Sequence, residues 1–176
     1  MFKKIAVASI ILAASSSVAF ASASPYVGAA LGVNTLTSTS GTNYRGVPVD
    51  VFAGYGATIN TNLYLAGEVF VTPMTGTISS SNNNLRTTYG FGASILPGIM
   101  FSDHTLGYIR AGLVRSHFSS IGENKTGGQL GVGMQTSVAQ NIDLRTEYVF
   151  TAYNKVSPAK SPKSDAFKLA LIYKFE

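Results

Sequence analysis

Four charged residues and one glutamine of this chain are spaced so that they could meet inside a folded domain. The two glutamates and Arg110 each follow a short polar turn by six residues, and Arg145 follows one by four. The glutamine stands five residues before the last of these turns. Segments that run in the same direction from such turns would bring these groups to similar heights. The set is Glu68, Arg110, Gln135, Arg145 and Glu147.

Opposite charges at one height can form buried ion pairs, and two functions follow for such a cluster. An unpaired buried charge costs several kcal/mol, so each carboxylate needs a cationic partner. A static cluster would fix the register of the segments that carry it. A cluster whose ion pairs re-form could instead gate the passage of water or small ions.

The elements that carry these residues read as β-strands. Alternation of apolar with small or polar residues, a period of two, is the strand signature. Each stretch is long enough for a tilted membrane strand of about 9–11 residues. The predicted strands are Tyr26–Asn34, Val47–Ile59, Leu63–Thr72, Arg86–Phe101, Leu106–Phe118, Gly127–Ala139, Ile142–Tyr153 and Ala166–Phe175.

The gaps between these strands alternate in length. Short turns at one end and long loops at the other are typical of bacterial outer-membrane barrels. Only helices and closed barrels can span a bilayer, because every backbone polar group must be paired there. We therefore predict an all-β fold, an eight-stranded antiparallel up-and-down transmembrane β-barrel. The short gaps are Asn60–Asn62, Ser102–His104 and Gln140–Asn141, and the long ones are Thr35–Gly46, Pro73–Leu85, Ser119–Thr126 and Asn154–Asp165.

The two faces of the strands set the orientation of the barrel. One face is apolar and ends in aromatic residues: Tyr55, Tyr89, Tyr148, Phe150, Tyr173 and Phe175. The other carries the charged cluster and many glycines: Gly28, Gly32, Gly54, Gly56, Gly90, Gly92, Gly112, Gly131 and Gly133. A soluble barrel such as a lipocalin would turn the apolar face inward, but glycines give an outer face no solubility. We therefore expect the apolar face to meet lipid, with an aromatic girdle.

The interior of an eight-stranded barrel is just wide enough for side chains to fill. This width favours the static cluster over the gate. Pro97 is the exception to the strand pattern, because it removes one backbone donor from a strand that is paired on both edges. We expect a bulge or a break in pairing at Pro97–Gly98.

The first residues read as a cleaved signal peptide. Lys3 and Lys4 precede a short apolar run, and a small-residue site follows. We predict a signal peptide over residues 1–23, cleaved after Ala21 or Ala23, and one barrel domain over residues 24–176. The chain has no cysteine and a net charge of +5, of which two lysines lie in the predicted signal. This mild charge does not indicate nucleic-acid binding.

No residue pattern makes a convincing catalytic or cofactor site. Some small barrels are lipid A deacylases with a Ser/His/Glu site at the loop rim, and His117, Ser119 and Glu123 offer the same residue types. A catalytic triad is recognised by geometry rather than by spacing, so we predict no enzyme activity. Two histidines, no cysteine and dispersed carboxylates predict no metal site, and we expect no cofactor.

Three segments resemble the OmpA-like and opacity-protein-like outer-membrane β-barrels. Residues 94–113, SILPGIMFSDHTLGYIRAGL, resemble a strand-turn-strand of that family, residues 131–148 its next hairpin, and residues 169–175, LALIYKF, its closing strand. The resemblance implies a salt-bridged interior made by Glu68, Arg110, Arg145 and Glu147. It also implies an assembly signal at Tyr173 and Phe175, read by the barrel-assembly machinery. The separate peptidoglycan-binding domain of full-length OmpA proteins has no counterpart in the residues given.

The expected function is that of a small barrel in the outer membrane of a Gram-negative bacterium. Its role would be structural or an adhesion-type surface interaction through the four long loops, with a host or matrix ligand. The alternative is a narrow or gated porin-like channel for water or small ions. Contacts with lipid or lipopolysaccharide are expected at Arg115 and in the loop with Lys155, Lys160 and Lys163, although such a loop is more often simply solvated. We expect a monomer.

Overall fold

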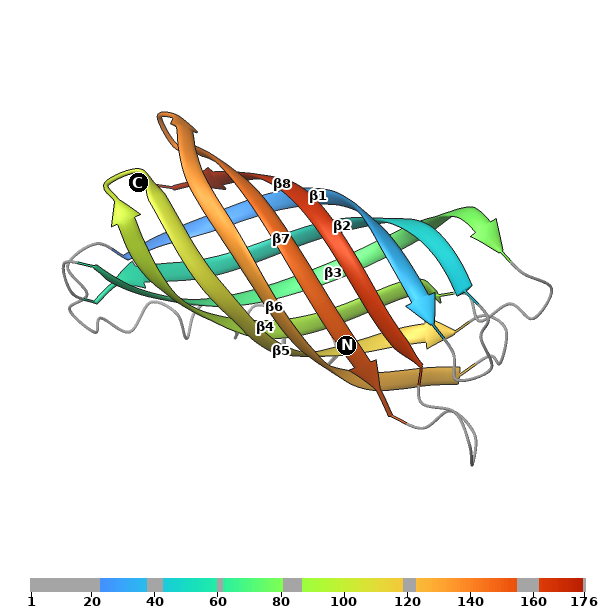
Figure 1. Ribbon diagram of the computed structural model, residues 1–176. Coiled ribbons are helices and arrows are strands. Elements are labelled where there is room, and N and C mark those ends of the chain that lie inside the picture. The colour runs from blue at the N-terminus through green and yellow to red at the C-terminus, as the bar shows by residue number, and fades with distance from the viewer. Residues whose placement is uncertain are drawn as a thin grey trace, which may run out of the picture.

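Each predicted stretch of alternating residues forms a strand in the computed structural model, which describes residues 23–37, 43–59, 62–80, 87–118, 123–154 and 162–175. The strands are β1 (Ala23–Thr37), β2 (Asn43–Thr58), β3 (Leu63–Ser80), β4 (Thr87–Ser102), β5 (Thr105–Phe118), β6 (Glu123–Ala139), β7 (Ile142–Tyr153) and β8 (Lys163–Lys174). Figure 1 shows them as one tilted set around a common axis.

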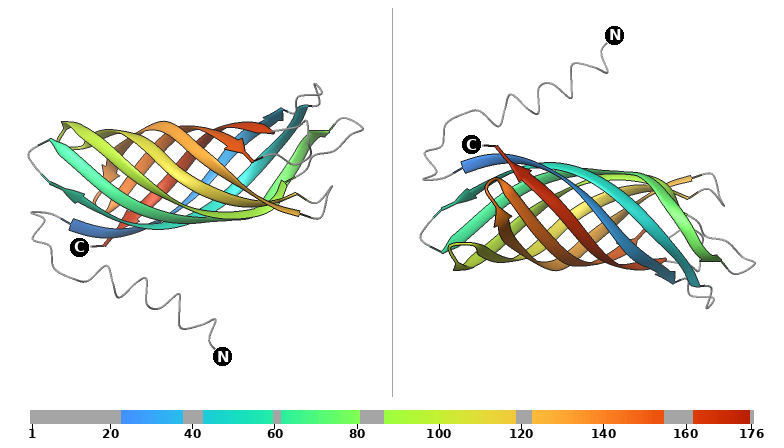
Figure 2. Two further views of the ribbon diagram at one scale, coloured as in Figure 1. Left: turned by 90° about the horizontal axis from the view of Figure 1, so that it is seen from below. Right: turned by 90° about the horizontal axis from the view of Figure 1, so that it is seen from above.

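The sheet closes on itself. Each strand pairs antiparallel with the next in sequence, and β1 pairs with β8, for example at Val27 and Tyr173. The start of β1 and the end of β8 therefore lie at the same end of the barrel (Figure 2). This arrangement confirms the predicted eight-stranded antiparallel barrel. Within the described ranges, no helix is long and apolar enough to cross a membrane.

The apolar face of the strands points outward. Leu113 and Leu130, on β5 and β6, keep 65% and 62% of their surface exposed, whereas Glu68 on β3 keeps 4%. A face that exposes so many large apolar side chains would be unstable in water and is suited to a lipid surround. The predicted aromatic residues of this face are outward too, and Tyr89, Tyr148 and Tyr173 are each more than two-fifths exposed.

Inside the barrel, an aromatic ring lies opposite a glycine on the neighbouring strand. The register places Tyr26 of β1 opposite Gly54 of β2, and a Cβ atom added to that glycine would overlap the Tyr26 ring. The same relation holds for three further pairs: Phe52 with Gly28, Phe70 with Gly92, and Tyr108 with Gly133. The inward glycines thus leave the space that the inward rings occupy.

The strands extend further into the predicted long loops than the sequence pattern indicated. The segments that separate strands at this end are 38–42, 81–86, 119–122 and 154–162, shorter than the predicted loops. The difference arises because the hairpin ladder continues past the apolar belt, where Ser, Thr and Gly still pair across strands. Thr37 pairs with Asn43, and Tyr44 pairs with Ser80. We call this end the loop end and the opposite one the turn end.

The irregularity predicted at Pro97 is present as a break in pairing and not as a bulge. The register between β4 and β5 is the same on both sides of Pro97, so no residue is inserted. The paired residues pass from Ile95 directly to Gly98, so the ladder is interrupted where proline lacks its N–H. A register shift instead occurs in β3 between the pairs Val49–Met74 and Val51–Val71, at Thr72 and Pro73. Pro97 therefore interrupts one ladder, whereas the bulge lies at Pro73, which the sequence pattern assigned to a loop.

Candidate functional site

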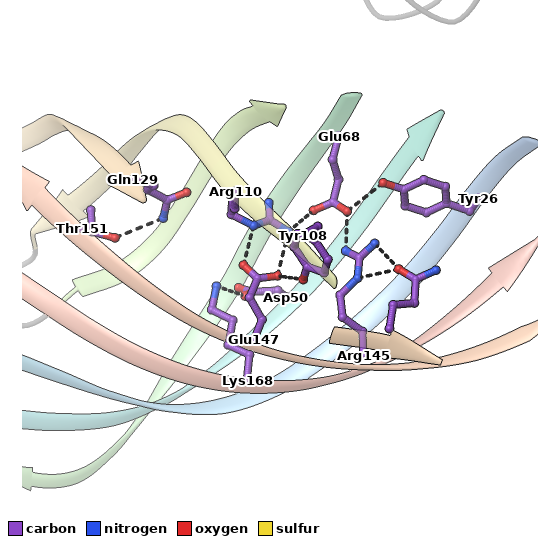
Figure 3. Close-up of polar contacts among 11 residues, drawn as sticks. Tyr26, Asp50, Glu68, Tyr108, Arg110, Gln129, Arg145, Glu147, Thr151 and Lys168 are labelled. Carbon is purple, nitrogen blue, oxygen red and sulfur yellow. Dashed lines mark hydrogen bonds and ion pairs between the residues drawn. The ribbon is translucent and has the colours of Figure 1, made fainter. Parts of the chain in front are cut away.

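The five predicted cluster residues come together at mid-height inside the barrel. Glu68 lies on β3, Arg110 on β5, Gln135 on β6, and Arg145 and Glu147 on β7. Strands β3, β5 and β7 run in the same direction from the turn end, so similar distances from their turns give similar heights. Each of the five side chains is buried. Figure 3 shows Glu68, Arg110, Arg145 and Glu147 pointing toward one another inside the barrel.

Arg110 bridges the two glutamates. Its Nη2 atom donates to Glu68 Oε1 at 2.5 Å and to Glu147 Oε2 at 3.0 Å. Its Nε atom donates to Glu147 Oε1, which completes a two-bond contact with that carboxylate. Two parallel hydrogen bonds between a guanidinium and a carboxylate fix the orientation of both groups and also strengthen their attraction. Arg110 therefore ties β5 to both β3 and β7.

Arg145 occupies the adjacent position towards the turn end. Its Nη1 atom donates to Glu68 Oε2 at 2.6 Å, and its Nε and Nη2 atoms donate to Gln135 Oε1 at 3.0 and 2.8 Å. Three rings surround the guanidinium at 5.1–5.5 Å, those of Phe52, Tyr108 and Tyr26. Cation–π contacts of this kind stabilise a cation that water does not reach, and Arg145 is only 2% exposed.

Two tyrosines complete the hydrogen bonding of the glutamates. The Tyr26 hydroxyl donates to Glu68 Oε2 at 3.0 Å, and the Tyr108 hydroxyl donates to Glu147 Oε2 at 2.7 Å (Figure 3). The sequence analysis did not select either residue. Their inward parity and their glycine partners on the next strand were the signals that could have found them.

Two further ion pairs flank the cluster and were also missed. Towards the loop end, Lys168 Nζ lies 2.6 Å from Asp50 Oδ2, and Thr72 donates to the same carboxylate. Towards the turn end, Lys174 Nζ lies 3.1 Å from Asp143 Oδ1, and Asp143 Oδ2 also accepts from Gln135. The turn-end pair is linked to the cluster through Gln135, and the loop-end pair lines the same space as Arg110 and Glu147. In the cluster and the two flanking pairs, four cations face four carboxylates, so these groups together carry no net charge.

The arrangement makes a plug rather than an open passage. Every charged group of the cluster has an ion-pair partner, and Glu68, Glu147 and Arg145 make further hydrogen bonds. Buried charges are tolerated under this condition. A polar cavity lies between the plug and the loop end, lined by Asn34, Gln129 and Ser116 among others. Asn34 Oδ1 and Gln129 Oε1 have no hydrogen-bond partner among the described residues, so the cavity offers acceptors to water.

The outer surface at the loop end carries exposed cations. Arg115 on β5 and Lys163 at the start of β8 are exposed, as is Arg45 on β2, which the sequence analysis did not select. Lys163 belongs to a strand and pairs with Ala152, whereas the sequence analysis assigned it to a loop. Lys155 and Lys160 lie outside the described residues.

At the turn end, Tyr173 and Phe175 both face outward, and their rings meet edge to face with centroids 5.1 Å apart. They are the two residues that the resemblance proposed as an assembly signal. The predicted signal-peptide residues 1–22 lie outside the described part of the chain.

The residues considered for catalysis do not form a site in the described structure. The His117 ring stacks on Tyr89 with centroids 4.9 Å apart, and its Nδ1 atom is 3.0 Å from Asn124 Oδ1. Ser119 and the side chain of Glu123 lie outside the described part of the structure. Within that part, no three His, Asp or Glu side chains are grouped so that they could hold a metal ion.

Comparison with known proteins assigns a family to this architecture. A family model described as "Outer membrane protein beta-barrel domain" matches residues 5–175. No curated protein matches the sequence significantly.

Solved structures share the fold at low sequence identity. Neisserial surface protein A aligns with a TM-score of 0.62 and 22% identity, over 88% of this chain and 99% of that chain. Ail, the attachment invasion locus protein of Yersinia pestis, aligns with a TM-score of 0.53 and 18% identity, over 87% and 97%. A second Ail structure, in complex with the heparin analogue sucrose octasulfate, gives a TM-score of 0.55, 18% identity and the same coverage.

Proposed function

The chain belongs to the outer membrane protein beta-barrel family and resides in the outer membrane of a Gram-negative bacterium, and from this premise we propose that it is a surface-interaction protein. Its ligand is a polyanionic glycan of a host surface or matrix, bound at the loop end. The barrel is the rigid support that holds the loop end above the membrane.

The distribution of charge carries this proposal. The ion-paired groups inside the barrel carry no net charge, so the positive charge of the mature chain comes from other residues. By sequence, the residues at the turn end include Asp103 and Glu176. Those at the loop end include seven cations against Glu123 and Asp165. The cations are Arg45, Arg86, Arg115, Lys125, Lys155, Lys160 and Lys163. A surface of one sign attracts ligands of the opposite sign and accelerates their association.

The comparison with Ail supports the same class of ligand. That protein has been solved with a heparin analogue, a densely sulfated sugar. The likeness between the two chains extends to the fold, so the ligand class for this chain is inferred from its own loop-end charge.

A channel is the second candidate and is less well supported. The charge cluster fills the barrel at mid-height with fully paired side chains, which leaves little room for solutes. The polar cavity above the cluster is the observation in its favour, because it extends a wettable space from the loop end down to the Asp50–Lys168 pair.

A binding experiment on heparin tests the proposal. The folded barrel in nanodiscs is passed over immobilised heparin, with neutral dextran as the control surface. We expect binding that weakens steeply with salt, and a loss of about tenfold in affinity when Lys155, Lys160 and Lys163 are all changed to Gln. The matched triple change to Arg keeps the charge and should keep the affinity. Absence of wild-type binding, or equal binding by the Gln variant, would reject the proposal.

A further inference from the structure

We propose that the outer face of the barrel carries a specific site for lipid A. One acyl chain lies in an apolar groove that crosses the outer face from β1 to β5, and a phosphate group binds Arg115. Of the seven loop-end cations, only Arg115 belongs to this site, and it lies on the wall of the barrel in β5. The lysines changed in the heparin experiment are not part of the site, so the two proposals are tested separately.

The groove arises from a change in side-chain size along the hydrogen-bonding direction. The register aligns Ala53, Val69 and Ala93 on adjacent strands, and it aligns the larger Val51, Val71 and Phe91 in the row above them. Both rows face outward, and together they line one continuous apolar groove. The two alanines make the lower row shallow, so a chain can lie against it below the larger side chains.

The groove runs from the turn end towards the loop end. Val27, near the start of β1, lines its lower part, and Arg115, near the end of β5, lines its upper part. Neighbouring strands are about 4.8 Å apart, so the path from β1 to β5 is about 19 Å across the strands. That length suits a saturated acyl chain of a membrane lipid.

Arg115 supplies the polar end of the site. Its side chain is exposed on the outer face, directly opposite Phe91 in the β4–β5 register. It makes no ion pair or hydrogen bond with any residue that the structure describes. The lining also includes Thr126, its partner on β6, whose hydroxyl adds a second polar group. A guanidinium is the preferred partner of a phosphate, which it can bind through two hydrogen bonds.

The membrane leaflet in which Arg115 lies indicates which lipid binds there. The loop end of an outer-membrane barrel faces the cell exterior, so Arg115 meets the outer leaflet, where lipid A presents phosphates at the headgroup level. Arg45 and Lys163 lie at the same end but line no part of the groove. They provide a charge without an adjoining acyl site, which makes them internal controls.

The absence of tryptophan from the chain allows a direct test. Phe91→Trp places one fluorophore in the groove, and Phe167→Trp places one on the outer face of β8, outside it. Each variant is folded into vesicles of brominated phosphatidylcholine, which quenches tryptophan on contact. Lipid A is then added to about 10 mol%. Preferential binding at the groove should restore the fluorescence of the Phe91→Trp protein about threefold more than that of the Phe167→Trp protein.

Second substitutions separate the site from general lipid contact. Arg115→Gln should reduce the recovery at Phe91→Trp to the level of the Phe167→Trp protein, and Arg45→Gln should leave it unchanged. Ala93→Leu should fill the groove and reduce the recovery, whereas Ala152→Leu, on the outer face of β7, should not. Migration of the unboiled protein on gels verifies that each variant is folded.

Three outcomes would overturn the site. They are equal recovery at the two tryptophans, recovery that survives Arg115→Gln, and equal recovery when phosphatidylglycerol replaces lipid A. The vesicles contain no glycan ligand, so a failure of heparin binding leaves this result unaffected, and a failure here leaves the heparin experiment unaffected.

Discussion

At the scale of single residues, the packing of the barrel interior depends on glycines, which have no Cβ atom and so leave room for neighbouring rings. Gly54 lies beneath the Tyr26 ring, whose hydroxyl donates to Glu68. Gly67, one residue before Glu68, faces outward with nothing within 4 Å of an added Cβ. An inward glycine is therefore required by packing, whereas an outward glycine is not.

We predict that Gly54→Ala destabilises the barrel by about 1–3 kcal/mol, the usual cost of overpacking a filled core. The added methyl group displaces Tyr26 and weakens its hydrogen bond to Glu68. Gly67→Ala is the matched control and should be neutral or stabilising by about 0.5 kcal/mol, because glycine weakens a strand interior. The measurement is urea unfolding of both variants in lipid vesicles. Equal effects at the two positions would contradict the proposed role of the inward glycines.

At the scale of the strand, Pro97 shows how one missing donor affects a closed sheet. The β3–β4 ladder continues through Pro97, opposite Leu65, whereas the β4–β5 ladder skips Leu96 and Pro97. The register is kept because the pairs on either side of the gap, Ile95–Ala111 and Gly98–Tyr108, hold it. Pro97 itself is exposed on the outer face, so a β-branched residue fits there without repacking the interior.

Pro97→Val should therefore restore the missing pairing and stabilise the barrel by about 0.5–1.5 kcal/mol, the net value of one hydrogen bond. Amide hydrogen exchange checks the mechanism, because the amide that this substitution introduces should be protected as strongly as its neighbours in β4. Pro73→Val is the control. Pro73 sits at a register shift in β3, so the new amide would have no regular carbonyl partner on the neighbouring strand. Rapid exchange at the new amide of the Pro97 variant would mean that the ladder is broken for another reason.

The strand scale also shows what the sequence could predict. Alternation assigns each residue to one face of its strand. The barrel, the outward direction of its apolar face and the burial of the charged cluster could therefore all be predicted from the sequence. Distance from a turn placed Glu68, Arg110 and Glu147 at one height because their strands run in the same direction. The stagger between oppositely directed strands is not written in any local pattern. For this reason the Asp143–Lys174 pair, between β7 and β8, was missed. Asp50 and Lys168 lie on β2 and β8, which run in the same direction, but each strand follows a long loop, and the length of such a loop sets no height. All four residues were on the correct face.

The ends of the strands were the second failure. Segments rich in Ser, Thr, Asn and Gly were read as loops, but a hairpin ladder can extend through such residues once its two strands are in register. Ile78, on β3 beyond the predicted end of that strand, is 58% exposed, so burial did not drive this extension. Backbone pairing did, and composition alone does not report it.

At the scale of the whole molecule, the ion cluster and the polar cavity together decide whether the barrel conducts. The cluster has two layers. Arg110, Glu147 and Arg145 all line a space that adjoins the polar cavity. Arg145 is in addition enclosed by Tyr26, Phe52 and Tyr108 nearer the turn end. The second layer is the tighter one, because three rings and Gln135 enclose a side chain that is almost entirely buried.

This layering predicts different effects for two double variants that both keep the interior neutral. Arg110→Ala with Glu147→Ala leaves Arg145 paired with Glu68, and the conductance in planar bilayers should stay near that of the wild type. Arg145→Ala with Glu68→Ala leaves Arg110 paired with Glu147 but removes the side chain at the narrowest layer, and we expect about a tenfold rise in conductance as water fills the space. Since each variant retains one intact ion pair, a difference between them reports the position of the barrier rather than the loss of charge. A high wild-type conductance that neither variant changes would instead identify a pathway that bypasses the cluster, and the channel would then replace surface binding as the leading function.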